Sequence, residues 1–133
     1  MKRPFFYTLL GTTAATDTAF IHLPVLKPGQ WLEPTFLGVY NNSGEAITAL
    51  AGITDQGSFV PLYDKTSITS GSGVVLSNGE SMFIREGEKL SFGAIGASDS
   101  GPWTAVARGW LHEGEYIVNE IAQEIQAAQA TGS

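Results

Sequence analysis

The chain has 133 residues, of which 43% are hydrophobic and 15% are charged, and its 13 acidic and 7 basic side chains give a net charge of −6. This length suits one domain with a sizeable core, and so apolar a composition excludes charge-driven disorder. The acidic balance argues against nucleic acid and anionic membranes as partners, because both select a concentrated positive patch. The absence of cysteine excludes disulfides, thiolate metal sites and thiol catalysis.

The first apolar run follows Lys2 and Arg3 and reaches only Leu10. It is too short for an export segment, and no stretch approaches the roughly 20 apolar residues that a membrane span needs. The first predicted strand is Tyr7–Thr12, preceded by an N-terminal arm. The second is Thr18–Leu23, which ends before a proline because proline cannot donate to a ladder.

Glycine and proline then divide the chain into short runs of β-branched and aromatic residues, which is typical of all-β proteins. A turn is expected at Leu26–Gln30, another at Asn41–Gly44, and a flexible loop at Ser70–Gly73. The remaining extended segments are Thr35–Tyr40, Ala46–Thr54, Ser58–Leu62, Ile68–Leu76, Ser81–Arg85, Lys89–Ala94 and Trp103–Leu111.

About eight strands with turn signals every 8–12 residues predict an antiparallel β-sandwich or jelly roll. The C-terminal segment has a different pattern, in which Ile117, Ile121 and Ile125 recur at helical spacing. A short helix is marginal alone in water, so its isoleucine stripe is expected to pack on the sandwich or on another chain. The predicted division is a β-sandwich domain with the N-terminal arm at residues 1–112 and a helical tail at 113–133.

The sequence offers few groups for catalysis. His22 and His112 form no metal-ligand motif, and a cupin-like metalloenzyme would need both to converge and recruit carboxylates. Glu86, Glu88 and the loop aspartates are interpreted as turn charges rather than as a glycosidase pair or calcium ligands. No nucleophile elbow or phosphate loop is present. The sequence therefore predicts a protein that is not an enzyme and that has no cofactor and no metal site.

Large aromatic residues are the main candidates for contacts with a ligand or partner. Trp31, Trp103, Trp110 and Tyr40 are of the kind that sugar-binding modules and protein interfaces use, although core packing is the commoner role. Trp103 and Trp110 are seven positions apart. Because this spacing is odd, the two side chains point to opposite faces of a regular strand. We expect one in the core and the other exposed.

Several features of the sequence layout lie between residues 20 and 109. They are the Leu26–Gln30 turn, the strand that closes on Asn41–Gly44, the Val74–Leu76 run, and the turns at Gly79-Glu80 and Glu86–Leu90 that lead into a final hydrophobic strand. In this layout the chain resembles small β-sandwich accessory proteins of tailed-phage virions, the class of capsid decoration (cement) proteins and of fibre and baseplate modules.

The resemblance implies a compact sandwich without chemistry that clamps neighbouring shell subunits through an extended terminus. It implies the major capsid protein or another virion protein as partner, a homo-oligomer with a trimer favoured, and a location in the virion. The helical tail departs from many such proteins and leaves the mode of attachment open, as well as the choice between capsid and tail. The residues expected to contact a partner are Phe5, Phe6, Tyr7, Trp31, Trp110, Ile117, Ile121 and Ile125.

An alternative function is a carbohydrate-binding or host-recognition module of a phage tail or fibre. It is motivated by the tryptophans, by Tyr40 and by the aspartates in predicted loops.

Overall fold

The computed structural model describes residues 2–15, 17–79, 83–96 and 99–114, and within them the chain is all-β. Short runs of β-branched and aromatic residues form the strands, because such side chains pack well on a pleated, half-buried surface. The strands are β1 (Lys2–Thr12), β2 (Thr18–His22), β3 (Gln30–Asn41), β4 (Ile47–Asp55), β5 (Ser58–Ile68), β6 (Ser72–Asn78), β7 (Glu88–Ile95) and β8 (Pro102–Glu113).

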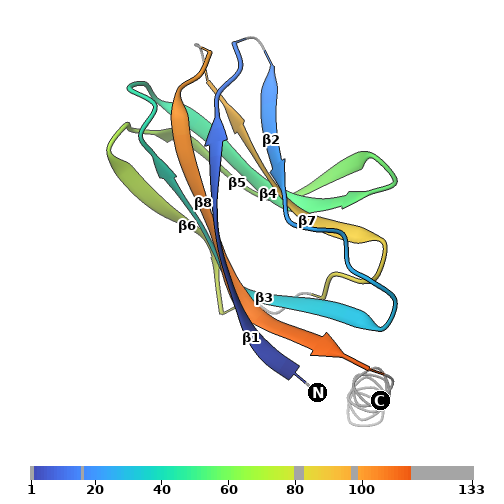
Figure 1. Cartoon of the computed structure of the whole chain (residues 1–133). Coiled ribbons are helices and arrows are strands. Elements are labelled where there is room, and N and C mark those ends of the chain that lie inside the picture. The colour runs from blue at the N-terminus through green and yellow to red at the C-terminus, as the bar shows by residue number, and fades with distance from the viewer. Residues whose placement is uncertain (1, 16, 80–82, 97–98, 115–133) are drawn as a thin grey trace, which may run out of the picture.

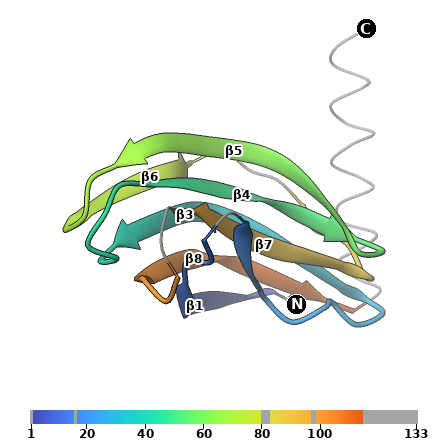
Figure 2. The ribbon, with the colours of Figure 1, turned by 90° about the horizontal axis from the view of Figure 1, so that it is seen from above.

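These strands form two four-stranded antiparallel sheets, ordered β1-β8-β3-β6 and β2-β7-β4-β5. Strands pair from the two ends of the chain inwards: β1 with β8, β2 with β7, β3 with β6 and β4 with β5. One long hairpin folded over on itself gives this order, which is that of a jelly roll. Figures 1 and 2 show the strands of both sheets from two directions. The predicted β-sandwich is therefore confirmed.

The core lies between the two sheets and follows the two-residue alternation of strands. On β8 every second residue from Trp103 to Ala107 is buried, and Leu37 on β3 and Phe92 on β7 face the same interior. Trp103 fills the space beside Gly11, where an added Cβ would lie 2.5 Å from the indole ring. The missing side chain of Gly11 thus makes room for the largest side chain of the core.

A β-bulge accompanies the proline on β3. Pro34 pairs with Gly109 of β8, and the pairing of β3 with β6 begins only at Phe36. The register with β8 shifts between Pro34 and Phe36, which is the local irregularity that tolerates a proline. Opposite the bulge stands Gly109, where a Cβ would overlap the carbonyl oxygen of Glu33.

The turn predicted at Asn41–Gly44 is confirmed and is built around a fully buried asparagine. The Asn41 Nδ2 group donates to the carbonyl oxygens of Glu45 at 2.7 Å and Ile68 at 2.8 Å. The Asn41 Oδ1 atom accepts from the Ser43 amide at 2.9 Å. The side chain therefore satisfies backbone groups that a buried turn would otherwise leave unpaired.

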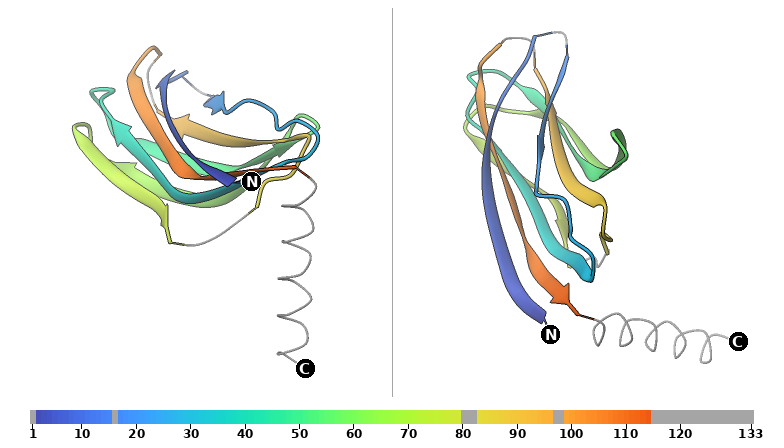
Figure 3. Two further views of the ribbon diagram at one scale, coloured as in Figure 1. Left: turned by 60° about the horizontal axis from the view of Figure 1, so that its bottom comes forward. Right: turned by 45° about the vertical axis from the view of Figure 1, so that its right-hand side comes forward.

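The prediction of an N-terminal arm before Tyr7 is wrong for residues 2–6. They belong to β1, which pairs residue by residue with β8 from Lys2 to Thr12. Pro4 is accommodated in this strand because proline is tolerated on an edge strand. Figure 3 shows β1 running along the border of its sheet.

Two further segments differ from the prediction. The fifth strand does not stop at Leu62 but continues to Ile68, and a tight turn with Gly71 at φ +87° leads directly into β6. Of the segment expected to be a flexible loop, Ser70 and Gly71 lie in a turn that connects the two sheets, and Ser72 and Gly73 belong to β6. Of the strand expected at Ser81–Arg85, the described part contains a single bridge, between Ile84 and Leu32.

Glu113, the first residue of the predicted helical tail, belongs instead to β8. From Glu115 onward the predicted tail lies outside the described residues. Within the described ranges, no helix is long and apolar enough to cross a membrane.

Candidate binding surfaces

The β1-β8-β3-β6 sheet exposes large apolar side chains on the side that faces away from the core, which we call the outer face. Each of its four strands contributes to this face. Exposed apolar side chains that gather on one face are a common mark of an interaction surface. The other sheet also exposes apolar side chains, at Phe20, Val60, Leu62 and Ile95. The exposed side chains of the outer face are Phe6 and Leu10 on β1, Trp110 on β8, Tyr40 on β3 and Val75 on β6.

The register of the strands arranges the outer face in rows. Exposure is greatest along β1, where the exposed fraction reaches 80% at Leu10 and 65% at Phe6. From one end of the sheet to the other, the rows are Leu10, Thr104 and Tyr40; Thr8, Val106, Gly38 and Val75; Phe6, Arg108 and Phe36; and Pro4, Trp110 and Glu33.

Two cations lie over aromatic rings of this face. The Arg108 guanidinium is 4.6 Å from the centroid of the Phe36 ring, and the Lys2 ammonium is 4.9 Å from that of Trp110. Such contacts hold a charged group against an apolar surface. Both basic side chains therefore lie against aromatic rings of the outer face. Phe6 lines a shallow hollow of about 330 Å³ together with Arg108 and Trp110.

One end of the outer face is closed by a cluster around His112. The His112 Nε2 atom lies 2.9 Å from Glu33 Oε1, and the Phe83 ring packs against the imidazole at 5.8 Å between centroids. Trp31 meets Phe83 edge-on at 6.4 Å. This buried histidine is thus held by packing and by one polar partner.

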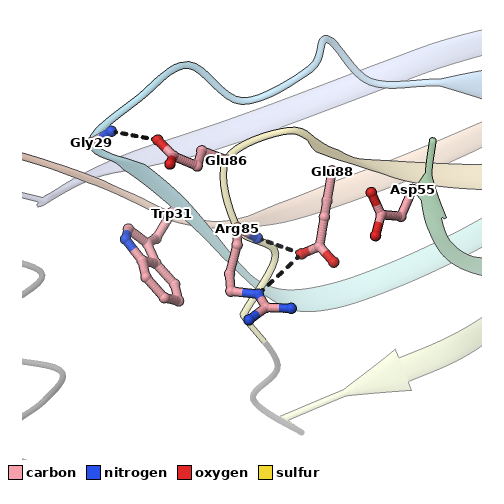
Figure 4. A pocket seen from close by; sticks show the side chains of 6 residues that line it. All are labelled: Gly29, Trp31, Asp55, Arg85, Glu86 and Glu88. Carbon is pink, nitrogen blue, oxygen red and sulfur yellow. Dashed lines mark hydrogen bonds and ion pairs between the residues drawn. The ribbon is translucent and has the colours of Figure 1, made fainter.

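A second candidate site is an open hollow of about 520 Å³. It is formed where the turn before β3, the end of β4 and the start of β7 meet, and Figure 4 shows its side chains. An aromatic platform next to charged groups is the arrangement that sugar-binding sites use. The hollow is lined by Gly29, Trp31, Asp55, Arg85, Glu86 and Glu88.

The two glutamates of this hollow hold backbone turns. Glu86 Oε2 accepts from the Gly29 amide at 3.3 Å, and Glu88 Oε1 accepts from the Arg85 amide at 2.8 Å while lying 3.7 Å from Arg85 Nε. Their interpretation as turn charges agrees with these bonds. Within the described ranges, no group of three or more histidine, aspartate or glutamate side chains is placed to hold a metal ion.

His22 and His112 do not meet, because they lie in different sheets. His22 Nδ1 is 2.6 Å from Ser91 Oγ, and Ser91 Oγ is 2.7 Å from Thr54 Oγ1. Burial and the nearby Lys89 lower the pKa of His22. The Ser91 side chain is fully buried, so this pair offers a substrate no accessible nucleophile.

The structure separates the residues that the sequence predicts as partner contacts. Phe6 and Trp110 lie near each other on the outer face, whereas Trp31 lies at its end, next to the second hollow. Phe5 points the other way and packs against the core, and Tyr7 shares its side of β1. Ile117, Ile121 and Ile125 lie outside the described residues.

The expectation for the other tryptophans is confirmed, because Trp103 is buried in the core and Trp110 is exposed. Sequence reasoning missed Leu10, Val75 and Arg85 as surface candidates. Leu10 follows another leucine, so alternation alone does not reveal which of the two faces outward. Nothing in the local sequence indicates that Arg85 lines a hollow, since Gly29, Trp31 and Asp55, which line it too, come from distant parts of the chain.

Comparisons with known proteins assign no family to this chain. Searches against protein-family models and against curated proteins find no match. One solved chain, from Bacillus endospore appendages described as a novel family of disulfide-linked pili, is similar over 80% of this chain and 86% of its own length, with 13% sequence identity and a TM-score of 0.43. A likeness of this degree carries no argument about the fold or function of this chain.

Proposed function

We propose that this chain is a non-enzymatic structural protein of a phage virion, a capsid decoration protein that binds the major capsid shell through its outer face. The observation that carries the proposal is the set of exposed apolar side chains that runs across all four strands of one sheet. The layout resemblance to phage accessory proteins supplies the identity of the partner.

The chemistry of the outer face suits a protein partner. Aromatic rings and arginine are enriched at the centres of protein interfaces, and both occur here, with Arg108 over Phe36 and Trp110 close by. The strands provide a broad, rigid platform, which limits the entropy lost on binding. Copies bound at repeated positions on a shell would gain avidity from weak individual contacts.

The direct test is co-sedimentation of the purified chain with expanded heads of the phage that encodes it, with unexpanded heads as a control. We expect stoichiometric binding to expanded heads and its loss in a Tyr40→Ser, Trp110→Ser double variant. The matched control is Val60→Ser, an exposed apolar side chain on the opposite sheet. Failure of the wild-type chain to bind, or equal binding by the double variant, would overturn the proposal.

A second candidate function, carbohydrate binding, is favoured by the hollow beside Trp31. The indole ring borders a space that also holds Arg85 and Asp55, which can bond sugar hydroxyls. A glycan array with and without calcium tests it, with Trp31→Ala as the disabling variant. A blank array for the wild-type chain would remove this candidate.

A further inference from the structure

The free edge of β1 is a long, regular strand edge with no described strand beside it. β1 has 11 residues and pairs with β8 over all of them without a register shift. Among the strands that the structure describes, none pairs with its other side, since β1 ends the sheet order. An unpaired edge of this kind is a template for another strand.

Between Phe5 and Thr12 the strand has none of the residues that normally prevent edge pairing. It contains no charged side chain and no proline there, and Pro4 lies near its start. Its most exposed side chains, Phe6 and Leu10, are apolar. An apolar edge without charge, proline or bulge favours strand addition.

Two hollows adjoin β1. One, of about 160 Å³, lies between the start of β1, including Phe5 and Tyr7, and the segment Leu23–Lys27. The other, of about 380 Å³, lies between Leu10–Ala14 and Ala19–Ile21. In Figures 1 and 3 β1 is seen at the border of its sheet.

We propose that a second copy of this chain adds its own β1 antiparallel to this edge, with the twofold axis at Thr8. Thr8 then stands opposite Thr8 of the second copy, and Phe6 stands opposite Leu10 of the second copy. Phe6 and Leu10 are the most exposed large apolar side chains of the strand. The pairing places Phe6 against Leu10 of the other copy on both sides of the axis, so both side chains of each copy become covered. Aromatic–aliphatic and threonine–threonine pairs are favourable across antiparallel strands.

Charge supports a second copy as the occupant. Lys2 and Arg3 lie at the start of β1, with Arg3 paired to Glu113 at 2.6 Å. Asp17 and Asp99 lie near its other end, where each bonds a backbone amide. In an antiparallel pair the basic start of one strand meets the acidic end of the other, and the twofold axis repeats this complementarity.

This pairing would join two outer faces into one surface and does not depend on the identity of the partner proposed above. A strand edge alone buries less area than a standard stable interface. We therefore expect a dimer that dissociates on dilution. The trimer that the phage resemblance implies would contradict a twofold pairing at Thr8.

The experiment is sedimentation equilibrium of the full chain over a wide range of concentrations. We expect a monomer–dimer equilibrium for the wild type and a dissociation constant raised roughly tenfold or more in Thr8→Lys or Thr8→Asp, because like charges would face each other at the axis. An equimolar mixture of the two variants should restore the dimer. Leu62→Lys, an exposed position on β5, is the matched control and should leave the equilibrium unchanged.

A second measurement tests the geometry without relying on charge. The chain has no cysteine, so a Thr8→Cys chain carries a single thiol. That thiol can form a disulfide only with the same residue of a second copy. We expect a crosslinked dimer on mild oxidation, and none from Val60→Cys on β5. A wild type that stays monomeric or forms trimers, or a Thr8→Cys chain that crosslinks no faster than Val60→Cys, would overturn the proposal.

Discussion

β1 and β5 are the two longest edge strands of the molecule, each of 11 residues, and each is the last strand of its sheet. β5 carries Pro61 in its middle and Asp64 and Lys65 soon after. Its pairing with β4 also shifts register twice. Proline, charge and bulges are the features by which proteins prevent edge-to-edge association, so β5 is a protected edge.

β1 differs in each of these respects along its middle and far end. It pairs without a shift, and only its start carries a proline and charges, at Lys2, Arg3 and Pro4. Its exposed side chains also continue onto the outer face of the same sheet. The comparison teaches that proline, charge and register shifts interrupt the border at β5, whereas the border at β1 is uninterrupted beyond Pro4. Exposed apolar side chains occur on both strands, with Val60 and Leu62 on β5.

The largest expected effect concerns the bulge that protects β5. A Cβ at Gly52 would overlap the backbone carbonyl of Val60, and backbone yields less readily than a side chain. We expect Gly52→Ala to lower the free energy of unfolding by about 2–3 kcal/mol, as measured by urea denaturation. The control is Gly73→Ala, whose nearest new contact is 3.5 Å away and which should change stability by less than about 0.5 kcal/mol. Equal effects of the two variants would contradict the role assigned to Gly52.

Removing the protection of β5 should create a second associating edge. A Pro61→Val, Lys65→Val double variant, made in the Thr8→Lys background to silence β1, should self-associate more strongly than its parent. Light scattering against concentration measures this. If the double variant stays as dispersed as its parent, the contrast between the two edges does not rest on these residues.

The smallest expected effect concerns His22, whose pKa is lowered by burial and by Lys89 from the usual value of 6.5. The folded state therefore takes up a proton less readily than the unfolded state. Stability is fully present above about pH 6.5 and is lost as pH falls through the lowered pKa. The urea midpoint of the wild type should drop between pH 7.5 and pH 5 more than that of His22→Gln. Parallel pH profiles for the two proteins would rule out this contribution.

Local patterns predicted most strands and turns because their signals lie within a few residues. The strand before Asn41 and the turn that follows it are examples. The hydrophobic pattern did not show which face of the sheet Phe5, Phe6 and Tyr7 occupy, since three consecutive aromatic residues show no alternation. Their faces are set by pairing with β8, about a hundred residues away in the chain.

The candidate surfaces were harder to predict for the same reason. Trp31 was identified from its residue type alone, but its neighbours Asp55 and Glu88 join it only because β4 and β7 pair in register. A single sequence does not specify that pairing. Which leucine of β1 faces outward likewise depends on the position of Trp103 opposite Gly11.

The most direct test of the account is amide hydrogen exchange of the full chain at low and high concentration. We predict that exchange of residues 5–11 on β1 slows as concentration rises, while exchange of residues 58–68 on β5 does not change. Slowing at β5, or no change at either edge, would contradict the claim that β1 is the associating border of this jelly roll.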